Sequence, residues 1–103
     1  MTTEGQAVAC ALAEGDFRER LAWIATLTRE ALRSYERDNL TLDLRYAPEA
    51  ASRVREMVRK EQACCAFLTF EMREQAGEVW LTIKAPEQAR PTADALFELF
   101  LPR

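Results

Sequence analysis

The stretch that decides the fold is a junction between two patterns, Glu61-Gln62-Ala63-Cys64-Cys65-Ala66-Phe67-Leu68-Thr69-Phe70. Before it, apolar residues recur at spacings of three and four, as they do on one face of a helix. After it, Leu68, Phe70 and Met72 alternate with polar residues, as they do on a strand. The junction therefore predicts a helix over 48–64 that is followed closely by a strand over 67–72.

On the N-terminal side of the junction, the pattern predicts a strand and then, further back, a long helix. Apolar and polar residues alternate over 40–46, which indicates a strand with one buried face. Pro48 follows, and it suits the first turn of the next helix. Apolar residues at spacings of three and four predict another helix over 16–35. Residues 1–15 are expected to form an N-terminal arm.

On the C-terminal side, the pattern predicts a hairpin and a last helix. Gly77 supplies the positive φ that a tight turn needs, and a return strand follows over 79–84. A helix is expected over 88–100. Pro91 either opens this helix at its first turn or splits off a short turn before it.

The element order is therefore α-β-α-β-β-α, which predicts a single α+β domain over 16–103. Three strands in a mixed sheet packed by helices would be a truncated ferredoxin-like arrangement that lacks the last strand. A right-handed crossover would make the first strand parallel to one strand of the hairpin. The expected core is Leu21, Ile24, Leu42, Leu44, Val54, Val58, Leu68, Phe70, Leu81, Ile83, Leu96 and Phe97.

Composition limits the classes of partner. The chain has 103 residues, enough for one domain, and its net charge of −3 gives no positive field that would attract nucleic acid. No apolar run is long enough for a membrane span, and the polar N-terminus lacks the basic region of a secretory signal. We therefore expect a cytoplasmic protein with reduced thiols, no nucleic-acid or membrane partner and no organic cofactor. A homodimer is left open.

The three cysteines are the candidate chemistry. The chain has no histidine, which removes imidazole metal ligands and Cys–His catalytic pairs. Glu61, Cys64 and Cys65 are spaced i, i+3 and i+4, so they share one helical face. The apolar stripe of this helix predicts an apolar residue at position 61, where the chain has a glutamate. Cys10 lies in a short apolar patch and offers a third sulfur. Such thiolates select soft ions of the Hg, As, Cd or Pb type, and Zn would use Glu61 as a further ligand.

Two other interpretations fit the same residues. In a structural or interaction domain the cysteines would be inert and buried, since free cysteines often pack as small hydrophobic residues, and Glu61 would then lean out and pair with Arg59 or Lys60. Alternatively, Cys10 exchanges a disulfide with the Cys64–Cys65 pair in a thiol redox protein. The end of a helix opposes the thiolate form, which argues against a bare nucleophile, although Lys60 offsets part of this effect.

Across about residues 10–100 the chain resembles a family of small bacterial proteins found near mercury- and arsenic-resistance genes. The resemblance rests mainly on Glu61-x-x-Cys64-Cys65-x-Phe67-Leu68, with Ala66 where family members commonly have proline. It implies heavy-metal binding at Cys10, Glu61, Cys64 and Cys65, and it implies no established activity. The expected function is sequestration or carriage of a soft metal ion, and not catalysis.

Overall fold

The computed structural model describes residues 14–102, with the side chains of 18–102 except that of Cys64. Its elements, in chain order, are α2 (Glu14–Ala31), β1 (Leu32–Asp38), β2 (Thr41–Tyr46), the 3-10 turn η1 (Pro48–Ala50), α3 (Ala51–Cys64), β3 (Thr69–Gln75), β4 (Glu78–Lys84), the 3-10 turn η2 (Glu87–Thr92) and α4 (Ala93–Glu98). The expected arm over 1–15 lies outside the described residues except for Glu14 and Gly15, which belong to α2.

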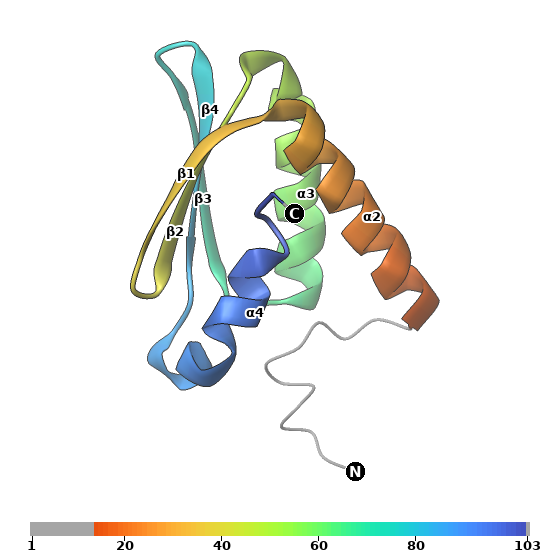
Figure 1. Ribbon diagram of the computed structural model, residues 1–103, viewed down its shortest axis with the longest axis vertical. Helices are drawn as coiled ribbons and strands as arrows, with labels where there is room; N and C mark the ends of the chain where they lie inside the picture. The colour runs from red at the N-terminus through yellow and green to blue at the C-terminus, as the bar shows by residue number, and fades with distance from the viewer. Residues whose placement is uncertain (1–13, 103) are drawn as a thin grey trace.

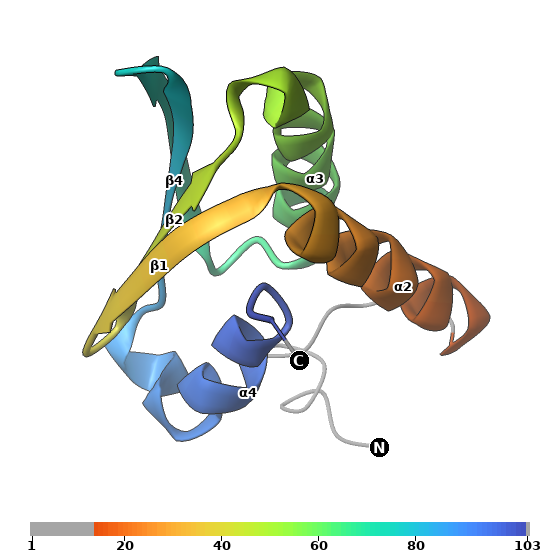
Figure 2. The same cartoon turned by 45° about the horizontal axis from the view of Figure 1, so that its top comes forward.

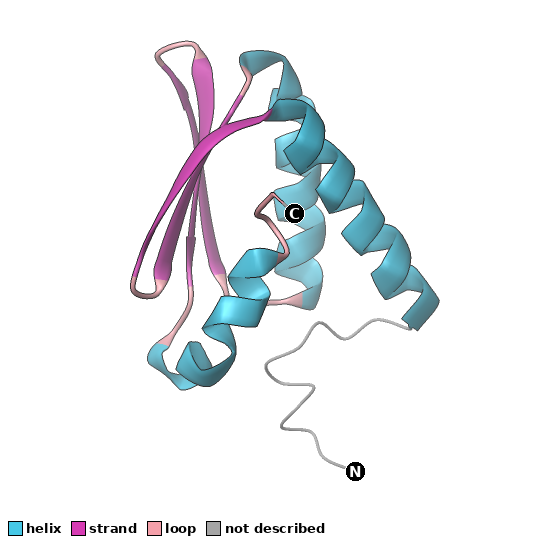
Figure 3. Cartoon of the chain, viewed as in Figure 1, coloured by secondary structure: helices cyan, strands magenta, loops and turns pink. Residues whose placement is uncertain are grey.

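The domain has two layers, a sheet and a layer of helices on one of its faces. Figure 1 shows α3 and α4 beside the sheet, with α2 packed further out against α3. The turned view of Figure 2 keeps the helices on the same side, and Figure 3 shows the strands together in the other layer. An antiparallel sheet tolerates one solvated face, so this arrangement needs no further layer.

The α+β class is confirmed, but the predicted three-stranded mixed sheet is wrong. Over residues 14–102 the sheet has four strands, in the order β1-β2-β4-β3. All three neighbouring pairs are antiparallel. It follows that β2 and β3 run in the same direction, as a crossover through α3 requires, but β4 lies between them and pairs with both.

The extra strand is β1, which the sequence pattern assigned to the end of the first helix. Helix α2 ends at Ala31, and Tyr35 pairs with Leu44 of the next strand. Asn39 has a φ of 59° in the connecting turn, a conformation that asparagine tolerates well. Nearly all of β1 is exposed at the edge of the sheet, so no alternation of apolar residues marks it. The ferredoxin-like pattern ends with a strand that this chain lacks within residues 14–102. Its place in the sheet, beside β2, is taken by β1, which comes from the N-terminal side.

The other boundaries lie close to those predicted. Helix α3 ends at Cys64 as expected, although the first turn after Pro48 is a 3-10 turn. Gly77 has the predicted positive φ of 71°, and Ala76 beside it has a φ of 54°. Of the two alternatives for Pro91, the second is confirmed, because this proline lies in η2 and α4 begins only at Ala93.

The core fills the space between the sheet and the helices. Leu42, Leu44 and Tyr46 of β2 point into it, together with Leu81 and other alternate residues of β4. Ten predicted core residues are buried, whereas Leu21 and Val58 are half-buried. The fully buried side chains also include Leu27, Tyr46, Met57 and Phe100, which the prediction left out.

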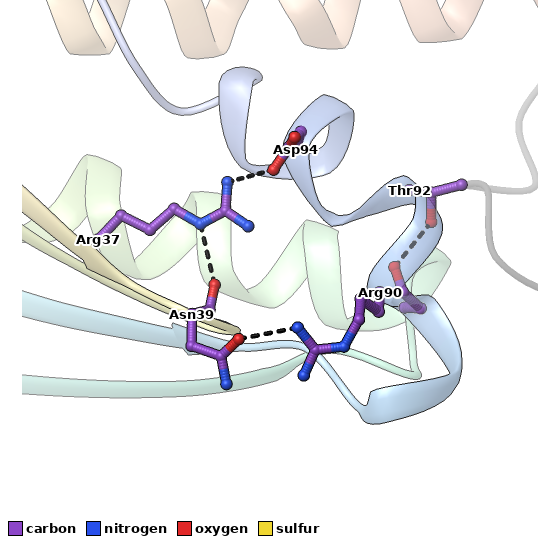
Figure 4. A network of polar contacts seen from close by, with 6 residues as sticks. Arg37, Asn39, Arg90, Thr92 and Asp94 are labelled. Carbon is purple, nitrogen blue, oxygen red and sulfur yellow. Dashed lines mark hydrogen bonds and ion pairs between the residues drawn. The ribbon is translucent and has the colours of Figure 1, made fainter.

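A group of polar contacts, here called the hairpin clasp, joins the β1–β2 turn to η2 and α4. Arg37 Nε donates to the Asn39 carbonyl at 2.9 Å, and Arg37 Nη1 lies 2.6 Å from Asp94 Oδ1. Arg90 Nη1 donates to Asn39 Oδ1 at 2.9 Å. Figure 4 shows these side chains converging, with Thr92 bonded to the Ala89 carbonyl nearby. The Arg37 guanidinium also lies 4.9 Å from the centre of the Phe97 ring, so the clasp is continuous with the core.

Candidate functional site

The candidate site lies where α3 ends and the chain turns toward β3. Cys65 leaves the helical conformation, with φ −125° and ψ 65°, and its N–H donates to the Glu61 carbonyl at 2.7 Å. Leu68 N–H then donates to the Cys65 carbonyl at 3.0 Å, which closes a tight turn before Thr69 begins β3. This turn holds the Cys65 side chain in the core, where the residue is 1% exposed.

Glu61 is fully buried, at 0% exposure, and is paired with a cation from another helix. Its Oε2 lies 2.5 Å from Arg20 Nε of α2, and Arg20 is itself only 8% exposed. A buried carboxylate needs such a partner, because desolvating an unpaired charge is costly. The alternative in which Glu61 leans out to Arg59 or Lys60 is therefore wrong. Both of those cations lie within ion-pair distance of Glu56 instead.

The surroundings of Glu61 act on its pKa in opposite directions. Burial raises the pKa of the Glu61 carboxyl above its ordinary value, and this is the larger effect. The Arg20 charge lowers the same pKa through the ion pair. The site therefore contains a buried carboxyl group whose charged form is favoured by Arg20.

The sulfur of Cys65 lies next to this pair. Cys65 Sγ is 4.0 Å from Glu61 Oε1, the oxygen that does not face Arg20. Cys65 is disulfide-bonded, and its partner sulfur is not among the described side chains. A disulfide sulfur has no proton to donate, so in this state the approach to Glu61 is a contact and not a hydrogen bond.

Two of the four predicted site residues are thus brought together, and the side chains of the other two are not described. Glu61 and Cys65 share a buried face as their spacing predicts. Cys10 lies outside the described residues, and so does the side chain of Cys64. Among the described residues, no three His, Cys, Asp or Glu side chains gather as a metal site would require. The three-sulfur arrangement therefore stays a prediction.

Arg20 is the site residue that sequence reasoning missed, although a signal for it exists. It lies four residues before Ile24, on the apolar stripe of α2, just as Glu61 lies on the stripe of α3. Two opposite charges at core-facing positions of two helices predict a buried pair, because neither charge is stable there alone.

Other features of the described chain are less promising as sites. A cavity of about 170 Å³ lies between α2 and the C-terminal segment, lined by Ala25, Thr28, Arg29, Leu101 and Pro102. Among the described residues that line it there is no cysteine and no carboxylate. Within residues 14–102, no helix combines the length and the apolar character that crossing a membrane requires.

Comparisons with protein-family models, with curated proteins and with solved structures find no match to this chain in any of the three. The residues at the end of α3 are therefore the basis for the function of this chain.

Proposed function

We propose that the reduced chain binds a soft metal ion through Cys65 and a second cysteine, as a sequestering or carrier protein. The observation that supports this is the bonded sulfur of Cys65 beside a buried carboxylate. Two sulfurs close enough to form a disulfide are, once reduced, close enough to bind one ion. Thiolates prefer soft ions such as As(III), Hg(II) and Cd(II).

Metal binding requires the disulfide to open first. A dithiol reduces the S–S bond by giving two electrons and two protons and becomes a disulfide itself. A phosphine gives the two electrons and becomes a phosphine oxide, with the two protons and the oxygen supplied by water. Either way the S–S bond becomes two thiols. Each thiol then releases its proton as it binds the ion, because the ion stabilises the thiolate. A reducing cytoplasm would keep the site in its binding form.

A second candidate function, thiol redox exchange, is favoured by the same disulfide. Against it stands the burial of Cys65, because every exchange cycle needs a protein or thiol partner to reach the sulfur, whereas metal binding needs the S–S bond to be reduced only once. A metal ion is much smaller than such a partner and needs only a brief local opening. The buried position therefore favours metal binding over exchange.

Native mass spectrometry tests the proposal directly. The chain is reduced with a phosphine, desalted without oxygen and mixed with Hg(II), arsenite, Cd(II) or Zn(II). We expect a one-to-one adduct with the soft ions for the reduced chain and none for the oxidised chain. Cys65→Ala should abolish the adduct, and the single variants Cys10→Ala and Cys64→Ala should identify the second sulfur.

Three outcomes separate the interpretations. Uptake of no ion by the reduced chain, or equal uptake by Cys65→Ala, would overturn the proposal. Repeated cycling of the disulfide by a mild oxidant and a dithiol, without uptake of any ion, would favour the redox alternative. Thiols that stay unreactive in the folded, reduced chain would leave only a structural role for the cysteines.

A further inference from the structure

The two oxygens of the buried Glu61 carboxylate face two different groups. Oε2 lies against Arg20 Nε at 2.5 Å, and Oε1 lies 4.0 Å from Cys65 Sγ. The side chains of Glu61 and Arg20 are 0% and 7% exposed, so water contributes little to holding either one in place. The guanidinium therefore fixes which oxygen faces the sulfur.

The gap between sulfur and oxygen is close to the one that a bound ion would need. In zinc sites the metal lies about 2.3 Å from a thiolate sulfur and about 2.1 Å from a carboxylate oxygen. At a tetrahedral angle, those two ligand atoms stand about 3.6 Å apart. The 4.0 Å between Cys65 Sγ and Glu61 Oε1 in the disulfide-bonded state is only slightly larger. Once the disulfide is opened, a small shift therefore brings both atoms within ligand distance of one ion.

Resting on the proposed function, we infer that Arg20 is a positioning residue of a mixed sulfur–oxygen metal site. It holds Oε2 of Glu61 so that Oε1 is presented, together with Cys65 Sγ, to a borderline divalent ion such as Cd(II) or Zn(II). Carboxylate ligands are usually oriented by such an outer partner, and losing the partner typically weakens metal binding about 10- to 100-fold.

Borderline divalent ions and arsenite should depend differently on Glu61 and Arg20. Cd(II) and Zn(II) accept oxygen together with sulfur, so their binding should depend on Glu61 and on its orientation by Arg20. Arsenite bound to thiolates is held by sulfur alone, so its binding should depend on neither residue. The ratio of the two affinities is therefore a readout that a purely structural role of Arg20 would leave unchanged.

The experiment measures dissociation constants of the reduced chain for Cd(II) and for arsenite. Arg20→Met should weaken Cd(II) binding by about 10-fold or more and change arsenite binding by less than about 3-fold. Glu61→Gln should do the same, and Arg20→Lys, which keeps the charge, should restore part of the Cd(II) affinity. Arg29→Met, on the exposed side of the same helix, is the matched control and should change neither value.

A double-mutant cycle completes the test. Arg20→Met combined with Glu61→Gln should bind Cd(II) no more weakly than Glu61→Gln alone, because Arg20 acts only through the carboxylate. If circular dichroism shows that Arg20→Met does not fold, the Cd(II) and arsenite affinities of Arg20→Lys and Glu61→Gln provide the test.

The failures of the two proposals are distinguishable. Equal loss of Cd(II) and arsenite binding in the variants, or no loss of Cd(II) binding in Glu61→Gln, would overturn the role of Arg20 while the metal-binding function stands. A wild-type chain that binds neither ion removes the function itself, and the inference falls with it.

Discussion

Tyr46 brings a hydroxyl group into the core beneath the sheet. The side chain is 0% exposed, and within residues 14–102 its Oη has no hydrogen-bond partner. Burial raises the pKa of the Tyr46 phenol above its ordinary value, because the charged form cannot be solvated there. The ring therefore contributes packing, whereas the hydroxyl contributes mainly a desolvation cost.

Tyr46→Phe should leave the free energy of unfolding unchanged or raise it by up to about 1 kcal/mol, because the ring is kept and the desolvated group is removed. Urea denaturation of the two proteins measures the difference. A loss of more than about 1 kcal/mol would instead mean that the hydroxyl forms a good hydrogen bond in solution.

Residue-level patterns in the sequence predicted the buried positions well, but not the pairing of charges. The alternation over 40–46 correctly placed Leu42 and Leu44 in the core. Glu61 stood out as a charge on an apolar stripe, yet its partner lies 41 positions earlier in the sequence, at Arg20. Periodicity reports on one element at a time, so it cannot join two helices whose packing is not yet known.

At the scale of elements, the hairpin clasp ties the first two strands to the last helix. Arg37 contributes an ion pair to Asp94, a hydrogen bond to the Asn39 carbonyl and a cation–π contact with Phe97. These contacts join the β1–β2 hairpin to a helical segment more than 50 residues later in the chain. They therefore hold α4 against the edge of the domain that β1 forms.

Arg37→Ala should lower the free energy of unfolding by about 1–2 kcal/mol, the combined size of a partly exposed ion pair and a cation–π contact. For a domain of this length the midpoint of thermal unfolding should fall by about 4–8 °C for each kcal/mol lost. Arg53→Ala, which removes the exposed pair with Glu30 on the helical side, is the control and should cost less than about 0.5 kcal/mol. Equal effects of the two variants would contradict a special role for the clasp.

The strand β1 shows why one element escaped prediction. Its sequence, Leu-Arg-Ser-Tyr-Glu-Arg-Asp, has six exposed residues. Because neither face of the strand is buried, apolar and polar residues do not alternate along it. Leu32 and Tyr35 also extend the helical spacing of the residues before them, which made the helix look longer. The turn at Asn39 was a usable signal, since a tight turn directly before a strand implies a partner strand on its other side.

At the scale of the whole molecule, the state of the Cys65 sulfur should affect stability as well as binding. A disulfide restricts the unfolded chain and typically stabilises a protein by about 2–4 kcal/mol. Reduction removes that restriction, and an ion bound only by the folded chain restores stability in proportion to its concentration.

The reduced chain should therefore unfold at a lower temperature than the oxidised chain. Arsenite at about 100 times its dissociation constant should recover about 2.7 kcal/mol. Differential scanning calorimetry of the oxidised, reduced and arsenite-loaded forms measures all three. Cys65→Ala is the control, since neither reductant nor arsenite should shift its midpoint through this sulfur. A wild-type midpoint that responds to neither treatment would contradict this coupling.

The edge strand that comes from the N-terminal side has a consequence for synthesis. Because β1 precedes β2 in the chain, all four strands have been translated once Lys84 is made. The sheet of residues 32–84 can therefore form on the nascent chain before α4 is synthesised. Of its strand pairs, only β2 with β4 joins segments that are distant in the sequence. Helix α4 with Phe97, and Phe100 just after the helix, are made after the sheet and cover apolar residues already in place. If translation stalled between Lys84 and α4, the nascent chain would expose part of the apolar face of a complete sheet. We expect chaperones to bind that exposed face.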